Sequence, residues 1–213
     1  MIKVDLKSRS IHLMGSTITI SILHEDADSL LDQVFSLLRL YEKRFSANDD
    51  SSELMQINHA AGKHAVCVHP DLFELIELGK KHSLAPDSHL NITLGPLVQT
   101  WRIGFADAKV PSPKEIKQAL ALTDPECIEL DAAASSVFLT MEGMKIDLGA
   151  LAKGYIADKI AAFLRGQGVT SALINLGGNI LTIGLNEKNN RCWWIGIQNP
   201  SLPRGNDLAL LSI

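Results

Sequence analysis

Apolar positions in the first part of the chain follow two different periods, and each period predicts a different kind of element. Residues 11–24 alternate in part between apolar and polar side chains and are rich in β-branched residues, which predicts a strand or one arm of a hairpin. Residues 26–45 carry apolar side chains at helical spacing with acids at the start, and residues 70–83 repeat the apolar spacing. Both of these segments are predicted helices.

The middle of the chain has a less regular pattern. Residues 46–52 are rich in Ser, Asn and Asp, which predicts a solvated loop leading into a short helix over 53–58. Residues 87–101 start like a strand, turn at a Gly-Pro pair and resume as an apolar segment. Residues 112–122 begin with Ser-Pro-Lys-Glu, a capping box with proline at the first helical position, and are therefore a predicted helix.

The last part of the chain is predicted to consist mainly of strands. Residues 128–130 and 136–140 are expected to pair as a hairpin, another strand ends at Asp147, and a helix over 149–167 follows it. Further strands are expected at 172–176, 180–184, 193–197 and 208–213. Helices and strands alternate irregularly and the last strands resemble a meander, so the predicted fold class is α+β, with mixed or antiparallel sheets flanked by helices.

The length of 213 residues is enough for a sizeable core, and we expect one domain over 1–213. Residues 207–213 end the chain inside a strand pattern, without a cap or a polar tail. Natural domains seldom end in this way, so we expect a domain that is truncated at its C-terminal end.

Composition narrows the class of protein. The chain is 46% hydrophobic and 21% charged, an ordinary globular composition, and its net charge of −4 without a Lys/Arg cluster argues against nucleic-acid binding. No apolar run approaches the ~20 residues of a membrane span, and residues 1–5 lack the features of an exported protein. Cys67, Cys127 and Cys192 form no CxxC pair. We therefore expect a soluble cytoplasmic protein that binds a small molecule or another protein.

The segment 146–154 carries the clearest chemical signal. An apolar run ends in Asp147, and small residues then surround one cation, Lys153, at the start of a predicted helix. The free N–H groups and positive end of a helix favour an anion, and small residues let a ligand approach the backbone, so phosphate is the natural ligand. The same small residues are equally consistent with close packing of a helix on a sheet. The small residues in this segment are Gly149, Ala150, Ala152 and Gly154.

Four blocks in order along the whole chain carry a resemblance to a known family. They are Met14-Gly15-Ser16-Thr17, then Phe45-Ser46 with Ser52 to Asn58, then Asn91 to Val98, and finally Ile146 to Asp158 followed by Asn175-Leu176-Gly177-Gly178-Asn179. With these blocks the chain resembles the N-terminal two-thirds of the ApbE family of FAD:protein FMN transferases. The resemblance implies the ApbE-like fold.

The resemblance also implies an activity. Members of the family cleave the pyrophosphate of FAD and attach FMN through a phosphoester to a threonine or serine of a target flavoprotein, a covalent modification that releases AMP and requires Mg2+. In physical terms this reaction is phosphoryl transfer, in which a metal neutralises charge and the protein positions the nucleophile. The implied partners are FAD and a flavoprotein, whose identity the chain leaves open along with its own oligomeric state.

Site residues follow from the resemblance position by position. It implies that Met14 contacts the flavin, although a core methionine at a strand end is an equally good interpretation. Asn48 occupies a loop position where some members have an aromatic residue that stacks on the flavin, which Asn cannot do. His89, Leu90 and Asn91 match a block that holds the adenosine part, with Asn91 in place of the usual Asp, so that an oxygen acceptor remains and a charge is lost.

The remaining implied residues lie in the fourth block. Asp147 matches an acid that contacts the flavin, Ala150 would offer its carbonyl to Mg2+, and Lys153 would approach FAD. Gly177 and Gly178 would line the same pocket, or simply form a hairpin turn that needs positive φ.

The family pattern continues with segments that these 213 residues do not contain, including an Asp followed four residues later by Thr or Ser that supplies the main metal ligands. We therefore expect residues 1–213 to hold FAD without efficient turnover, and the catalytic residues to lie outside them. An alternative is a non-catalytic flavin-binding module. A third interpretation, a phosphate-binding α+β domain unrelated to flavin, depends on residues 146–179 alone.

Overall fold

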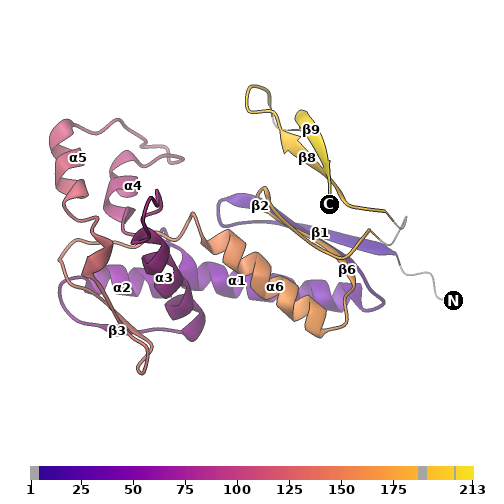
Figure 1. The fold of residues 1–213 in the computed structure, drawn as a ribbon, viewed down its shortest axis with the longest axis horizontal. Coiled ribbons are helices and arrows are strands. Elements are labelled where there is room, and N and C mark those ends of the chain that lie inside the picture. The colour runs from indigo at the N-terminus through magenta and orange to yellow at the C-terminus, as the bar shows by residue number, and fades with distance from the viewer. Residues whose placement is uncertain (1–4, 187–190, 204) are drawn as a thin grey trace. The chain divides into compact units, whose positions relative to one another are not determined.

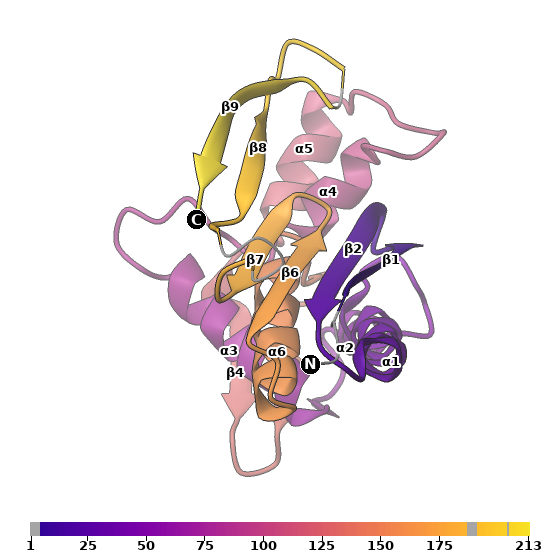
Figure 2. The same ribbon diagram turned by 90° about the vertical axis from the view of Figure 1, so that its right-hand side faces the viewer.

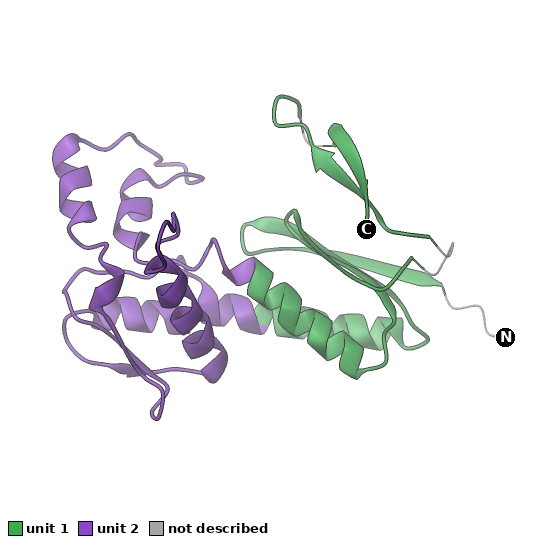
Figure 3. Ribbon diagram, viewed as in Figure 1, with its two compact units in different colours: residues 1–39, 154–213 green, residues 40–153 purple. Residues whose placement is uncertain are grey.

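A computed structural model describes residues 5–186, 191–203 and 205–213. The chain divides into two compact units, one formed by residues 1–39 with 154–213 and the other by residues 40–153 (Figure 3). Helices and antiparallel sheets make up both units, which confirms the predicted α+β class. Within the described residues no helix has the length and apolar character that a membrane crossing requires.

The first unit contains a four-stranded antiparallel sheet in the order β1-β2-β6-β7 (Figure 2). The sheet is built from two hairpins whose inner strands pair with each other, with Ile18 of β2 opposite Leu176 of β6. Its strands are β1 (Leu6–Leu13), β2 (Ser16–Leu23), β6 (Ser171–Leu176) and β7 (Asn179–Ile183).

One face of this sheet forms the core of the unit. Ile18, Ile20 and Ile22 alternate along β2 and are fully buried, as period-2 side chains on an inner face should be. Helices α1 (Ala27–Phe45) and α6 (Ala152–Gly166) lie along one side of the sheet in Figures 1 and 2. Their buried side chains include Leu31, Val34, Leu38, Ile156, Ile160 and Leu164, which confirms the helical spacing read from the sequence.

The first unit ends in a separate two-stranded antiparallel sheet, β8 (Trp194–Gln198) with β9 (Asp207–Ser212). All six residues of β9 are exposed, four of them alanine or leucine. The strands predicted at 193–197 and 208–213 are thus present, each shifted by one residue.

The second unit consists of short helices around a small antiparallel sheet in the order β3-β5-β4. The predicted hairpin is its main part, and the predicted helices at 53–58, 70–83 and 112–122 are all found. The elements are α2 (Glu53–Ala60), β3 (Val66–Cys67), α3 (Pro70–Ser83), α4 (Gly95–Trp101), α5 (Pro113–Leu120), a 3-10 turn η1 (Pro125–Cys127), β4 (Ile128–Asp131) and β5 (Ser136–Leu139).

The strand-like start predicted for residues 87–101 is wrong. The side chain of Asn91 accepts a hydrogen bond from the Thr93 backbone N–H at 2.8 Å, which closes an Asx-turn instead of extending the chain. A helix then begins at Gly95 with proline in its first turn. The apolar run that follows the turn therefore belongs to α4.

The strand predicted to end at Asp147 and the helix start predicted at Gly149 are also wrong. Residues 144–148 form no strand. The described hydrogen bonds of their backbone are made with the side chain of Asn58 and with loop groups instead. Helix α6 begins only at Ala152, after a turn in which the carbonyl of Leu148 accepts hydrogen bonds from the N–H groups of Leu151 and Ala152 at 2.9 and 2.8 Å.

Candidate functional site

Two tight turns meet at one end of the four-stranded sheet. Met14 and Gly15 connect β1 to β2 with φ of 52° and 67°, and Gly177 and Gly178 connect β6 to β7 with φ of 65° and 102°. Two central residues with positive φ fit the type I′ turns that match strand twist in hairpins. The β2–β6 register starts at Ile18, so the two turns lie at the same end of the sheet (Figure 2). The structure thus brings three sequence-predicted residues into one unit.

Met14 is held in a backbone conformation that bulky side chains rarely adopt. Positive φ at a non-glycine residue of this kind is strained, and such strain concentrates at functional sites. A Cβ atom added to Gly15 or Gly178 would meet nothing within 4 Å. The backbone of both turns is therefore open to close approach by a ligand.

Asp147 lies in the second unit, in a segment that is fixed from two sides. The amide of Asn58, which is only 5% exposed, donates to the Ile146 carbonyl at 3.1 Å and accepts from the Ile146 N–H at 2.8 Å. The N–H of Asp147 in turn donates to the carbonyl of Ile92 at 2.8 Å. These bonds place the block around Asn91 beside Asp147, although 55 residues separate Ile92 from Asp147 in sequence.

The side chain of Asn91 is committed to its own neighbourhood. Its Oδ1 accepts from the N–H and the hydroxyl of Thr93 at 2.8 and 2.6 Å, and its Nδ2 donates to the carbonyl of Thr123 at 2.7 Å. The amide therefore shapes the turn, with one Nδ2 hydrogen left over for a ligand. His89 is exposed and Leu90 is half-buried in the preceding loop.

The turn from Asp147 to Lys153 leads directly into α6. One carboxylate oxygen of Asp147 accepts the N–H of Gly149 at 2.8 Å, which holds the side chain against the turn. Gly149 and Ala150 are exposed, and the half-buried Lys153 is the second residue of the helix. The first N–H groups of a helix have no partner within it, so a positive helix end and a cation occur together here.

The described residues do not fit a complete magnesium site around Ala150. Mg2+ requires nearly octahedral oxygen ligation, and no group of three or more His, Cys, Asp or Glu side chains that could hold a metal occurs in the described part of the chain. The exposed residue Ala150 offers one carbonyl, and one oxygen of the Asp147 carboxylate already accepts the N–H of Gly149. No step of the chemistry can be assigned to a metal held by these residues alone.

Asn48 lies in the polar loop that the sequence predicted. It is exposed, and its N–H donates to the hydroxyl of Ser46 at 3.2 Å. Ser52 ends the loop by capping α2, accepting the N–H of Met55 at 3.0 Å while its hydroxyl donates to the carbonyl of Ser46 at 2.6 Å. The loop is thus well fixed, but Asn48 presents no ring to a flavin.

Sequence reasoning missed Asn58, the residue that fixes the Asp147 segment. It belongs to the second block of the family resemblance, which implies no role for it. Its signal was a polar amide among the buried residues of α2, because buried amides are retained where they satisfy backbone groups.

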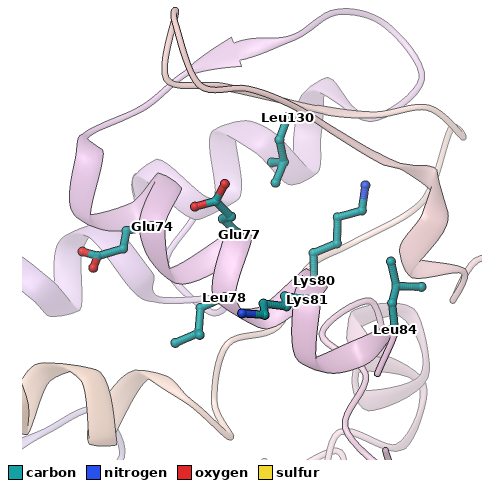
Figure 4. Close-up of a pocket in the computed structure, with 7 residues that line it drawn as sticks. All are labelled: Glu74, Glu77, Leu78, Lys80, Lys81, Leu84 and Leu130. Atoms are coloured by element: carbon teal, nitrogen blue, oxygen red, sulfur yellow. The ribbon is translucent and has the colours of Figure 1, made fainter. Parts of the chain in front are cut away.

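Two open concavities of the second unit contain none of the predicted site residues. Figure 4 shows the one on α3, of about 630 Å³, where two Glu and two Lys side chains project from one helix; the Nζ of Lys80 donates to the carbonyl of Ile128 at 2.5 Å. The other, of about 790 Å³, is lined partly by the ion pairs Arg102–Asp107 and Lys109–Glu115. Both are consistent with solvated surface.

The fold is that of solved flavin transferases of the ApbE type. The structure is similar to the ApbE protein from Thermotoga maritima with a TM-score of 0.88 and 23% identity, covering 98% of this chain and 68% of that one. It is similar to the flavin transferase ApbE from Vibrio cholerae with a TM-score of 0.84 and 24% identity, covering 93% of this chain and 65% of that one.

Sequence comparison gives the family. The ApbE family matches residues 14–213. An FAD:protein FMN transferase from Klebsiella pneumoniae is 46% identical over 193 residues, which cover 91% of this chain and 58% of that protein. One from Treponema pallidum is 37% identical over 187 residues, which cover 82% of this chain and 52% of that protein. The chain belongs to the ApbE family, and it spans little more than half the length of these curated relatives.

Proposed function

We propose that this chain is the FAD-binding part of an FAD:protein FMN transferase, which moves FMN from FAD to a Thr or Ser hydroxyl of a target flavoprotein. The observation that carries the proposal is the Asp147–Lys153 turn, fixed by Asn58 and by Ile92 and leading into a helix start with a cation. This arrangement suits a pyrophosphate. The names of the relatives at 46% and 37% identity support FAD as the donor.

The proposed reaction is an in-line displacement at phosphorus. The acceptor oxygen forms a bond to the phosphorus on the FMN side, the bridging P–O bond breaks, AMP leaves, and the hydroxyl proton is released. Catalysis of this kind depends mostly on positioning and on stabilising charge.

Each set of site residues has a proposed part in FAD binding. Lys153 and the start of α6 offset negative charge on the pyrophosphate. Met14 and the Gly177-Gly178 turn present an open backbone to the planar part of the ligand. For Asp147, His89, Leu90 and Asn91 we propose polar and backbone contacts to FAD.

The Mg2+ requirement is part of the proposal, with Ala150 as one ligand. When bound, Mg2+ would neutralise charge on the phosphate oxygens. Because the described residues do not supply the rest of an octahedral set, we propose that residues 1–213 alone bind FAD but do not transfer FMN at a useful rate.

The test is co-expression with a flavoprotein target that carries an acceptor Thr, followed by in-gel flavin fluorescence. The full-length Klebsiella pneumoniae relative serves as the positive control. We expect a fluorescent target band with that relative and none with residues 1–213, together with FAD binding by residues 1–213. A band with residues 1–213 would contradict the assignment of the metal ligands, and absence of FAD binding would contradict the proposal itself.

A further inference from the structure

Ser16 is the polar exception among the residues of strand β2 that face the core. It begins β2, and the side chains that follow it on the same face, Ile18, Ile20 and Ile22, are fully buried and apolar. It also directly follows the Met14–Gly15 turn and pairs with Leu13 across the hairpin. A hydroxyl therefore stands where the row of isoleucines would continue.

The hydroxyl of Ser16 is buried and has no hydrogen-bond partner among the described residues. Most buried polar groups in folded proteins are paired, and leaving one unpaired destabilises the fold, so each exception calls for an explanation. Ser16 as a whole is only half-buried, so its Oγ lies close under the surface, and rotation about χ1 can redirect it.

Two glycine turns with open backbone lie next to Ser16. Because Ile18 pairs with Leu176, Ser16 lies at the level where β6 turns through Gly177 and Gly178. Cβ atoms at Gly15 and Gly178 would meet nothing within 4 Å, so the space at both glycine positions is open. A flat ring could lie against two open turns, with its polar edge directed at the hydroxyl.

We propose that Ser16 is an FAD-binding residue whose hydroxyl hydrogen-bonds to the polar edge of one of the ring systems of FAD. This inference depends on the proposed function, because it takes FAD as the ligand. A hydroxyl both donates and accepts, so it can pair with a ring carbonyl, a ring nitrogen or a ring N–H. Isoalloxazine and adenine both present such an edge, and binding of their simplest derivatives distinguishes them.

The experiment measures FAD affinity by fluorescence titration for wild type, Ser16→Ala and Ser16→Thr, with the apo-protein unfolding midpoint as a second readout. We expect Ser16→Ala to weaken FAD binding by about 3–10-fold, the value of one net hydrogen bond, without lowering the apo midpoint. Ser16→Thr keeps the hydroxyl and should retain most of the affinity. Calorimetric titrations with riboflavin and with AMP assign the ring, because the Ala variant should weaken binding of only one of the two.

Ser10→Ala is the matched control. Its hydroxyl is exposed on β1 and pairs with the hydroxyl of Thr19 at 2.7 Å, so its loss should leave FAD affinity unchanged. Wild-type affinity in Ser16→Ala, or a lower apo midpoint with unchanged FAD affinity, would overturn the inference while leaving the proposed function intact. Weakened FAD binding with riboflavin and AMP both unaffected would overturn the ring contact. Absence of FAD binding by wild type would overturn the proposed function as well.

Discussion

Among single residues, the charge of Lys153 matters most for the proposed binding of FAD. Lys153 is the second residue of α6, beside the exposed Gly149–Ala150 turn. A cation at this place adds to the positive helix end, and both favour a pyrophosphate. Helix starts rich in small residues also occur for packing alone, so the charge is what distinguishes a binding site from a packing motif.

Reversing this charge should therefore weaken FAD binding. Lys153→Glu removes a charge-assisted contact and adds a repulsive one, and we expect a loss of about 1–3 kcal/mol in binding free energy. Fluorescence titration with FAD measures it. Lys159→Glu makes the same change of net charge further along α6, where the ammonium lies over the ring of Tyr155 at 4.9 Å, and should have a much smaller effect. Equal affinities for the two variants would place the pyrophosphate elsewhere.

Individual residues also show what the sequence could and could not predict about the site. Resemblance pointed to Asp147 and Lys153, and the structure finds them on one fixed turn. It could not reveal Asn58, because the two hydrogen bonds from this amide to Ile146 cross 88 positions of sequence. Nor could the resemblance show that the side-chain amide of Asn91 hydrogen-bonds to Thr93 and Thr123, since these bonds depend on where the backbone of the two threonines lies.

At the scale of elements, the segment before α6 is held by α2 and by the Asx-turn at Asn91, and by no strand partner. The short apolar run that ends in Asp147 predicted a strand there. Strand pairing, however, depends on a neighbouring chain, and Asn58 together with Ile92 takes that place. Local sequence patterns indicate burial reliably, but they do not indicate which group forms hydrogen bonds with the backbone N–H and C=O groups.

Removal of the Asn58 amide, which hydrogen-bonds to the backbone of Ile146, should lower the free energy of unfolding. Asn58→Ala leaves the N–H and the carbonyl of Ile146 unpaired in the core, and we expect the free energy of unfolding to fall by about 2–4 kcal/mol. Urea unfolding followed by circular dichroism measures this change. Asn48→Ala, in the exposed loop, is the control and should change it by less than ~0.5 kcal/mol. A similarly small loss for Asn58→Ala would show that the segment is held by packing instead.

The start of α5 offers a pH test of a different element. Hydrogen bonds from Lys109, and then from the N–H and hydroxyl of Ser112, lower the pKa of Glu115 from 4.5 to about 2. Because the pKa of Glu115 is lower in the folded than in the unfolded state, its ionised carboxylate stabilises the fold. This contribution is fully present above the unfolded-state pKa of 4.5 and is lost as pH falls through the folded-state pKa of about 2. The capping box should therefore persist through mildly acidic conditions.

NMR titration of the Glu115 carboxyl should give a midpoint near 2. Lys109→Gln removes the largest cause and should raise the midpoint, while the bonds from Ser112 keep it below the ordinary value. A wild-type midpoint close to 4.5 would mean that the Lys109 and Ser112 bonds do not persist in solution.

At the scale of the whole molecule, the fold class was predictable because helices and antiparallel hairpins each leave a periodic signal. The order β1-β2-β6-β7 was not, since the pairing of β2 with β6 joins segments about 150 positions apart. That pairing brings the Met14 and Gly177 turns to one end of a sheet. Family resemblance named both turns, and the register supplies the physical reason why they belong together.

We propose that these 213 residues bind FAD by themselves. Isothermal titration calorimetry of FAD into the purified chain tests it most directly. We expect saturable binding of one FAD per chain, with an affinity that falls as salt is raised because charge on the pyrophosphate contributes to it. Absence of saturable binding, or binding that salt does not affect, would contradict the account.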